Sequence, residues 1–87
     1  MSAIFGSVKT IILQPAAEKT LGKIDEPARS RIAEALNAYA IDCRGDTKAM
    51  AGTQTVRLRV EDYRIIFDET AATITVVALG HRRDIYR

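Results

Sequence analysis

The sequence predicts an α+β fold with elements in the order β-α-α-β-β-β and a helix hairpin covering one face of the sheet. Three observations support it: a short β-branched segment comes first, two stretches with helical apolar spacing follow, and apolar and polar residues then alternate with period two. With 87 residues, 47% of them hydrophobic and 28% charged, the chain can build one core. We therefore expect a single domain over residues 1–87, which excludes a two-domain enzyme.

The overall charge and cysteine content limit the function only broadly. Thirteen Lys and Arg against eleven Asp and Glu give a net charge of +2, so a nucleic-acid site must depend on where the charges lie. Cys43 is the only cysteine, which excludes an intrachain disulfide framework and favours a reduced, cytoplasmic setting. Residues 1–13 do not form a secretory-signal pattern, and no apolar run approaches the ~20 residues of a membrane span, so we expect a soluble protein.

The N-terminal half has the pattern of one strand and two helices. Residues 8–13 are short and β-branched, as in a strand. Pro15 suits the first position of a helix, where its missing N–H costs nothing, and Asp25 before Pro27 provides a second helix start. Apolar residues recur at helical spacing after each start: Ala17, Leu21, Ile24, Ile32, Leu36 and Tyr39. We expect a helix hairpin followed by a loop over residues 42–53, where glycines occur among polar residues.

From Thr55 onward the apolar period is two, which predicts strands over residues 55–60, 63–68 and 73–81. If Glu61-Asp62 is a two-residue turn, Arg59 faces Arg64 and the apolar side chains of the first two strands coincide on one face. That coincidence predicts one core shared by helices and strands: Ile32, Leu36, Leu58, Tyr63, Ile65, Phe67 and Val76.

The other face of the sheet is expected to gather the charges. If the alternation continues through the third strand, Ile74, Val76 and Ala78 join the core, and Thr75, Val77, Leu79 and His81 join Arg57, Arg59 and Arg64. Directly opposed like charges weaken a hairpin by up to ~1 kcal/mol. The Arg59–Arg64 pair therefore carries a cost that brings folding no benefit, which indicates a functional site. An ordinary solvent-exposed face is the alternative interpretation. The apolar residues exposed there favour a partner surface: Ile66, Val77 and Leu79.

The last segment, residues 80–87, is the richest in chemical groups. Its side chains can exchange a proton near neutral pH, bind phosphate and stack on a base: His81, Arg82, Arg83, Tyr86 and Arg87.

Two blocks, RLRVEDYRIIF at residues 57–67 and GHRRDIYR at residues 80–87, together resemble the RelE branch of the RelE/ParE toxin superfamily. In its order of elements the resemblance extends over residues 8–87. It implies a twisted, mainly antiparallel sheet with the helix hairpin on one face and a cationic groove on the other. It also implies the toxin of a type II toxin-antitoxin pair: a ribosome-dependent mRNA interferase, an endoribonuclease that inhibits translation and arrests growth.

The resemblance implies cleavage by the ribose 2′-hydroxyl without a metal or other cofactor. Its expected partners are a cognate antitoxin, forming a hetero-oligomer, together with the ribosome and mRNA, and no membrane. The catalytic residues it implies are Arg57, Arg64, His81, Arg82, Arg83 and Tyr86, where either Arg82 or Arg83 matches the later catalytic arginine. The expected RNA contacts are Arg57, Arg59, Arg64 and Arg87, and the expected antitoxin contacts are Ile66, Val77 and Leu79.

His81 is the expected proton acceptor in this scheme and Tyr86 the next, because a guanidinium is a poor base and is better suited to charge stabilisation. Thr55 stands where some RelE-type enzymes have a lysine. Two alternatives therefore stay open: a ParE-type poison of DNA gyrase, and a catalytically inactive antitoxin-binding module. The GHRRDIYR ending favours the ribonuclease, because a gyrase poison needs no catalytic tail.

Overall fold

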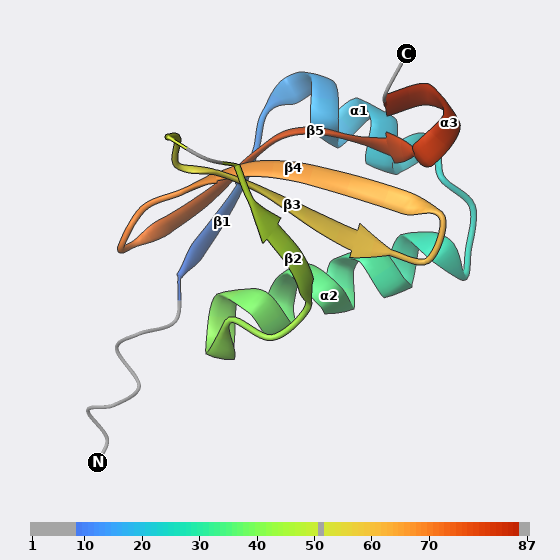
Figure 1. Ribbon diagram of the computed structural model, residues 1–87. Helices are drawn as coiled ribbons and strands as arrows, with labels where there is room; N and C mark the ends of the chain where they lie inside the picture. Colours follow the sequence, from blue (N-terminus) through green and yellow to red (C-terminus); the bar gives the residue numbers. More distant parts are fainter. Residues whose placement is uncertain (1–8, 51, 86–87) are drawn as a thin grey trace.

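The centre of the molecule is a five-stranded sheet with the strand order β1-β5-β4-β3-β2 (Figure 1). β1 runs parallel to β5, and the other neighbouring strands are antiparallel. A computed structural model describes residues 9–50 and 52–85. Its elements are β1 (Thr10–Leu13), α1 (Pro15–Lys23), α2 (Ala28–Asp42), β2 (Asp46–Ala49), β3 (Thr55–Val60), β4 (Tyr63–Glu69), β5 (Thr73–His81) and α3 (Arg82–Ile85). The predicted α+β class, with helices on a mainly antiparallel sheet, is confirmed.

Local chemistry accounts for the start of α1 and for the end of α2. Pro15 occupies the start of α1, as expected. α2 ends at Cys43, which takes a left-handed φ of 57° and donates its backbone N–H to the Tyr39 carbonyl at 2.8 Å. None of the helices among the described residues has the length and apolar character required to cross a membrane.

One core joins the two helices to a single face of the sheet. Six of the seven predicted core residues are buried, and Tyr63 is half-buried at the edge of the core. The buried residues are Ala17, Ile24, Ile32, Leu36, Tyr39, Ala40, Val56, Leu58, Ile65, Phe67, Ile74, Val76 and Leu79. Phe67 is fully buried and contacts the Tyr39 ring at a centroid distance of 5.1 Å.

The predicted register of the β3–β4 hairpin is confirmed: Val60 faces Tyr63 and Arg59 faces Arg64 across the two-residue turn. In the first part of β5 the predicted faces of Ile74 and Val76 are also confirmed, because both are buried and Phe67 faces Val76. The pairing then shifts by one residue, because Ile66 faces Ala78 and Val77 has no partner in β4. This is a β-bulge, in which one extra residue moves all later side chains of the strand to the opposite face.

The bulge corrects the predicted faces of three residues in β5. Leu79 was expected among the arginines, but it faces Ile65 and is 5% exposed in the core. His81 was also expected there, but it faces Tyr63. Ala78, expected in the core, instead faces half-buried Ile66 on the arginine side. The apolar run from Val76 to Leu79 satisfies either register, so the extra residue left no sign in the hydrophobic pattern.

The segment predicted as a loop over residues 42–53 contains the strand β2, which lies at the edge of the sheet beside β3 (Figure 1). All four of its residues are exposed. Gly45 leads into it with a φ of 148°, and a Cβ atom there would lie 2.9 Å from Leu58 Cδ1. Glycine therefore suits this position for its backbone angle and for its close approach to the core.

A polar network ties the start of the described chain to α2 and β4. Glu69 accepts hydrogen bonds from the Tyr39 hydroxyl at 2.8 Å and from the Lys9 ammonium group. Burial raises the pKa of Glu69, but the bonds from Lys9 and Tyr39 outweigh it and leave the pKa lowered. Burial and the bond to Glu69 raise the pKa of Tyr39 to about 12. The network therefore stabilises the fold when Tyr39 is protonated and Glu69 is ionised.

Truncation of the most central aromatic side chain should threaten folding. We expect Phe67→Ala to lower the free energy of unfolding by ~3–5 kcal/mol, because it leaves a large cavity in a small core. Urea denaturation monitored by circular dichroism measures the change. Ile12→Ala, at a side chain that is 45% exposed, should cost much less. Equal stability of the two variants would contradict the packing described above.

The Tyr39–Glu69 hydrogen bond should make the free energy of unfolding fall both at acidic and at alkaline pH. Because the Glu69 pKa is lowered in the fold, its contribution is present above the ordinary value of 4.5 and is lost as the pH falls through the folded pKa. Because the Tyr39 pKa is raised from 10.0 to about 12, its contribution is present below pH 10.0 and is lost as the pH rises through about 12. In denaturation curves, Tyr39→Phe should show a shallower alkaline loss than the wild type. An identical alkaline slope would exclude this role for Tyr39.

Candidate functional site

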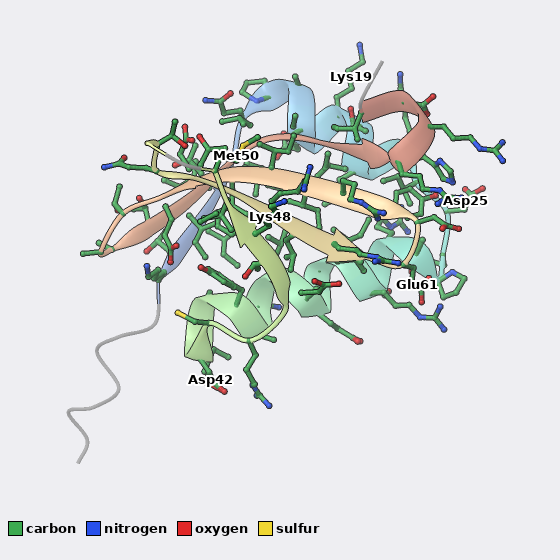
Figure 2. All side chains as sticks on the ribbon, in the orientation of Figure 1. Lys19, Asp25, Asp42, Lys48, Met50 and Glu61 are labelled. Carbon is green, nitrogen blue, oxygen red and sulfur yellow. The ribbon has the colours of Figure 1, made fainter. Side chains whose placement is uncertain are left out.

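The open face of the sheet gathers cations from three strands. Arg57 and Arg59 alternate along β3, and Arg64 faces Arg59 from β4, so all three lie on the face away from the core. On β2, Lys48 faces Arg57 and Asp46 faces Arg59. These five residues line a depression of about 340 Å³, which we call the basic depression. Figure 2 shows Lys48 in front of the sheet, and Lys19 of α1 far from it.

The opposed pair Arg59 and Arg64 is stabilised by oxygen atoms on two sides. Arg59 Nε lies 4.0 Å from Asp46 Oδ2. Arg64 Nη1 donates to the carbonyl oxygens of Glu61 and Tyr63, both at 3.0 Å. These contacts offset the like-charge repulsion and orient the Arg64 guanidinium from the β3–β4 turn. A guanidinium has five N–H donors in a planar fork, so a group held through Nη1 keeps other donors for a phosphate.

Thr55, at the position where the resemblance leads one to expect a lysine, is bonded within the sheet. Its hydroxyl donates to Asp68 Oδ1 at 2.8 Å, and the two residues face each other across β3 and β4. The neighbouring strand supplies an amine instead, because Lys48 lies opposite Arg57. Sequence reasoning missed Lys48 and Asp46. Their alternation with Thr47 and Ala49 was the available sign of a strand, and it was weak because all four are exposed.

The β5 bulge separates His81 from the basic depression. Its ring packs edge-to-face on Tyr63 at a centroid distance of 5.6 Å and an interplanar angle of 80°. Its Nδ1 accepts the backbone N–H of Arg83 at 3.2 Å. The expectation that His81 shares a face with Arg57 and Arg64 is therefore wrong. Ile66 and Val77, two of the residues expected to contact a partner, are half-buried.

The C-terminal arginines begin beside the hairpin turn. The Arg82 N–H donates to the Asp62 carbonyl at 2.7 Å, and its Nε lies 3.9 Å from Asp62 Oδ1. Asp62 is the second residue of the turn whose first residue, Glu61, orients Arg64. Arg83 is exposed on α3. Tyr86 and Arg87, which the resemblance assigns to catalysis and RNA binding, lie outside the described residues.

A larger cleft of about 620 Å³ lies on the helix side and has a different chemistry; we call it the helix-side cleft. His81 and Tyr63 line it with Asp25, Glu26 and Asp84, while Lys23 is the lysine in its wall. Carboxylates repel a polyanion, so the basic depression is the better phosphate site of the two. Across residues 9–50 and 52–85, no three His, Cys, Asp or Glu side chains form a group that could hold a metal ion.

Comparison with known proteins identifies relatives of this fold. Residues 11–86 match the family model described as the ParE toxin of the type II toxin-antitoxin system parDE. No curated protein matches the sequence significantly. The predicted membership of the RelE/ParE superfamily is confirmed by the family model.

Three solved structures have a similar fold, and each is a toxin-antitoxin complex. The RelB-RelE complex from Methanococcus jannaschii is 25% identical, with a TM-score of 0.68 over 86% of this chain and 94% of that chain. The RelE-RelB complex from Pyrococcus horikoshii is 16% identical, with a TM-score of 0.73 over 88% and 98%. The RelBE2 complex from Mycobacterium tuberculosis is 18% identical, with a TM-score of 0.65 over 85% and 98%.

If the basic depression binds nucleic-acid phosphates, Lys48→Ala should weaken binding in a salt-dependent way. The slope of log affinity against log salt should become shallower by ~0.7 for each phosphate of a single strand that the protein no longer neutralises. Fluorescence anisotropy with a labelled single-stranded RNA at several salt concentrations measures the slope. Lys19→Ala removes the same charge from α1 and should leave the slope unchanged. The same slope for both variants and the wild type would exclude Lys48 from the interface.

Proposed function

This chain belongs to the ParE toxin family of the RelE/ParE superfamily, and we propose that it is a type II toxin that cleaves mRNA on the ribosome. The observation that carries the proposal is the basic depression, where Arg57, Arg59, Arg64 and Lys48 gather on an open face. Cations on an exposed, rigid sheet suit a phosphodiester backbone that must enter from outside. The similar structures are of RelE toxins, which supports the ribonuclease branch.

The proposed reaction is attack of a ribose 2′-hydroxyl on the adjacent phosphorus. A bond forms between the 2′-oxygen and phosphorus, and the bond from phosphorus to the 5′-oxygen breaks. Arg64, oriented by the turn carbonyls, binds the phosphate oxygens. Arg57 and Lys48 face each other across β2 and β3 and stabilise the negative charge that develops on those oxygens. Phosphate binding and charge stabilisation do not require the arginines to give up or accept a proton.

Proton transfer requires a group other than the arginines, and that group must also lie in the basic depression. The 2′-hydroxyl loses a proton, and the leaving 5′-oxygen gains one. Among the described residues lining the basic depression, Asp46 is the carboxylate, and it lies 4.0 Å from Arg59. A carboxylate oxygen can accept the proton of a hydroxyl that is hydrogen-bonded to it. We assign proton acceptance to Asp46, because His81 lies on the other face of β5.

The proposed partner of the toxin is its antitoxin, with the ribosome and mRNA as its targets in the cytoplasm. The three similar structures are complexes with antitoxins. Half-buried Ile66 faces Arg57 of the basic depression, and half-buried Val77 lies on the neighbouring strand β5. An apolar and acidic antitoxin segment that crosses these strands could cover the two apolar residues and the arginines together. Leu79 takes no part in this surface, because it is buried in the core.

Poisoning of DNA gyrase is the second candidate function. It is favoured by the family model, whose description is that of a ParE toxin. The hydrogen bond between Thr55 and Asp68, at the position of an expected lysine, keeps an inactive antitoxin-binding module as a third outcome.

Arg64→Ala separates these functions. On programmed ribosomes the wild-type toxin should cleave mRNA, and Arg64→Ala should reduce the single-turnover rate by ~10²–10³, because an oriented electrostatic donor is lost. Toeprinting of the mRNA measures both rates. The variant should melt within a few degrees of the wild type, because only two side-chain hydrogen bonds at the end of the hairpin are lost and the one to the Glu61 carbonyl is exposed.

Arg29→Ala is the matched control, because Arg29 is exposed on α2 and pairs with Glu26 away from the basic depression. It should cleave like the wild type. If the wild type leaves ribosome-bound mRNA intact but stabilises gyrase–DNA cleavage complexes, gyrase poisoning replaces the proposal. If it does neither and Arg64→Ala changes antitoxin affinity alone, the protein is a binding module.

A further inference from the structure

The short helix α3 begins with two backbone N–H groups that the fold satisfies in different ways. The first, of Arg82, donates to the Asp62 carbonyl at 2.7 Å. The second, of Arg83, donates to Nδ1 of His81 at 3.2 Å. The first N–H groups of a helix have no partner within it, and a side-chain acceptor just before the helix commonly binds the second or third of them. His81 therefore occupies the N-cap position of α3.

The His81 ring is held in the orientation that this cap requires. The β5 bulge places His81 opposite Tyr63, and the Tyr63 ring packs against it nearly perpendicularly. A nitrogen that accepts a hydrogen bond carries no proton, so a neutral His81 has its proton on Nε2. A general base needs a ring nitrogen that is free to accept a proton from the substrate. In this geometry Nδ1 already accepts the Arg83 N–H, and Nε2 of the neutral ring carries a proton.

The position of α3 matters because the helix starts where the basic depression is assembled. Asp62 binds the Arg82 backbone, and the preceding residue, Glu61, orients Arg64. On the other side of the helix, a Cβ atom on Gly80 would lie 4.0 Å from Ile85 Cδ1, so the end of α3 folds back over Gly80. Gly80 itself faces Arg64 across β4 and β5. Two contacts thus connect the cap to the surroundings of Arg64.

We propose that His81 is a positioning residue: its Nδ1 caps α3 and thereby fixes Arg82 beside the turn that orients Arg64. It does not carry a proton in RNA cleavage. The capping of α3 is inferred from the contacts of His81, Asp62 and Gly80 alone. The effect of the cap on RNA cleavage rests on the proposed function.

Two substitutions, His81→Asn and His81→Gln, distinguish a helix-capping role of His81 from a role as general base. Each keeps a polar atom near the position of one of the two ring nitrogens. Asparagine places an acceptor where His81 has Nδ1 and is among the best N-cap residues, so His81→Asn keeps the cap without an imidazole. Glutamine extends a polar group toward the position of Nε2, and His81→Gln loses the short cap acceptor. His81→Ala loses both. A cap predicts that the Asn variant behaves like the wild type and that the Gln and Ala variants behave alike.

The first measurement tests the cap without any activity. Nitrogen-15 NMR of the full-length toxin should show the His81 ring with an unprotonated Nδ1 and a protonated Nε2. Hydrogen exchange of the Arg83 amide should be about two- to thirtyfold faster in His81→Ala and His81→Gln, the factor expected for a lost N-cap bond, and unchanged in His81→Asn. A protonated Nδ1 in neutral imidazole, or equal exchange in all four proteins, would overturn the cap.

The second measurement tests its effect on catalysis by toeprinting on ribosomes. His81→Ala and His81→Gln should cleave up to about 10²-fold more slowly, through misplacement of groups around Arg64, while His81→Asn should retain the wild-type rate. A loss of ~10²–10⁴ in His81→Asn with the cap intact would make His81 a proton carrier and overturn the proposal. A wild-type toxin that cleaves no mRNA would instead reject the proposed function, and the NMR result would still decide whether His81 caps α3.

Discussion

The alternation of side chains between the two faces of β3 and β4 is the constraint on which the rest of the structure depends. Val56, Leu58, Ile65 and Phe67 must face the helices to form a core, so the intervening residues can only face outward. The same register that buries the core therefore brings the arginines together. Folding and the basic depression share one determinant, and a slip of one residue would lose both.

The strand register could be predicted from the sequence only where apolar and polar residues alternate clearly. In the β3–β4 hairpin every second residue is apolar and a two-residue turn closes it, so only one register matches the two patterns. From Val76 to Leu79 each residue is apolar, and an inserted residue at Val77 changes nothing that a hydrophobic pattern can report. His81 and Leu79 were placed on the wrong face for this reason.

Two elements, β2 and α3, had a weak hydrophobic pattern or none. β2 is exposed at all four residues and is held by its pairing with β3, which is non-local information. Lys48 and Asp46 were missed with it, and so was the amine opposite Arg57. α3 has four residues, too few for a helical period, and it depends on partners outside itself: the Asp62 carbonyl and the His81 ring. In both cases tertiary contacts, and not local propensity, decide the structure.

The two-residue turn of the β3–β4 hairpin connects these parts. Glu61 has a φ of 55°, which is uncommon for a residue with a side chain, and the surrounding contacts must hold it there. Its carboxylate accepts from Arg31 of α2 at 2.6 Å, its carbonyl from Arg64, and the Asp62 carbonyl from Arg82. The exposed Arg31 pair adds little stability, because solvent screens it, but it orients the turn. A turn this short cannot lengthen without changing the register, so it holds Arg64 and the start of α3 at a fixed separation. The candidate site is thus built around a two-residue connection that several contacts hold, although two of its arginines face each other.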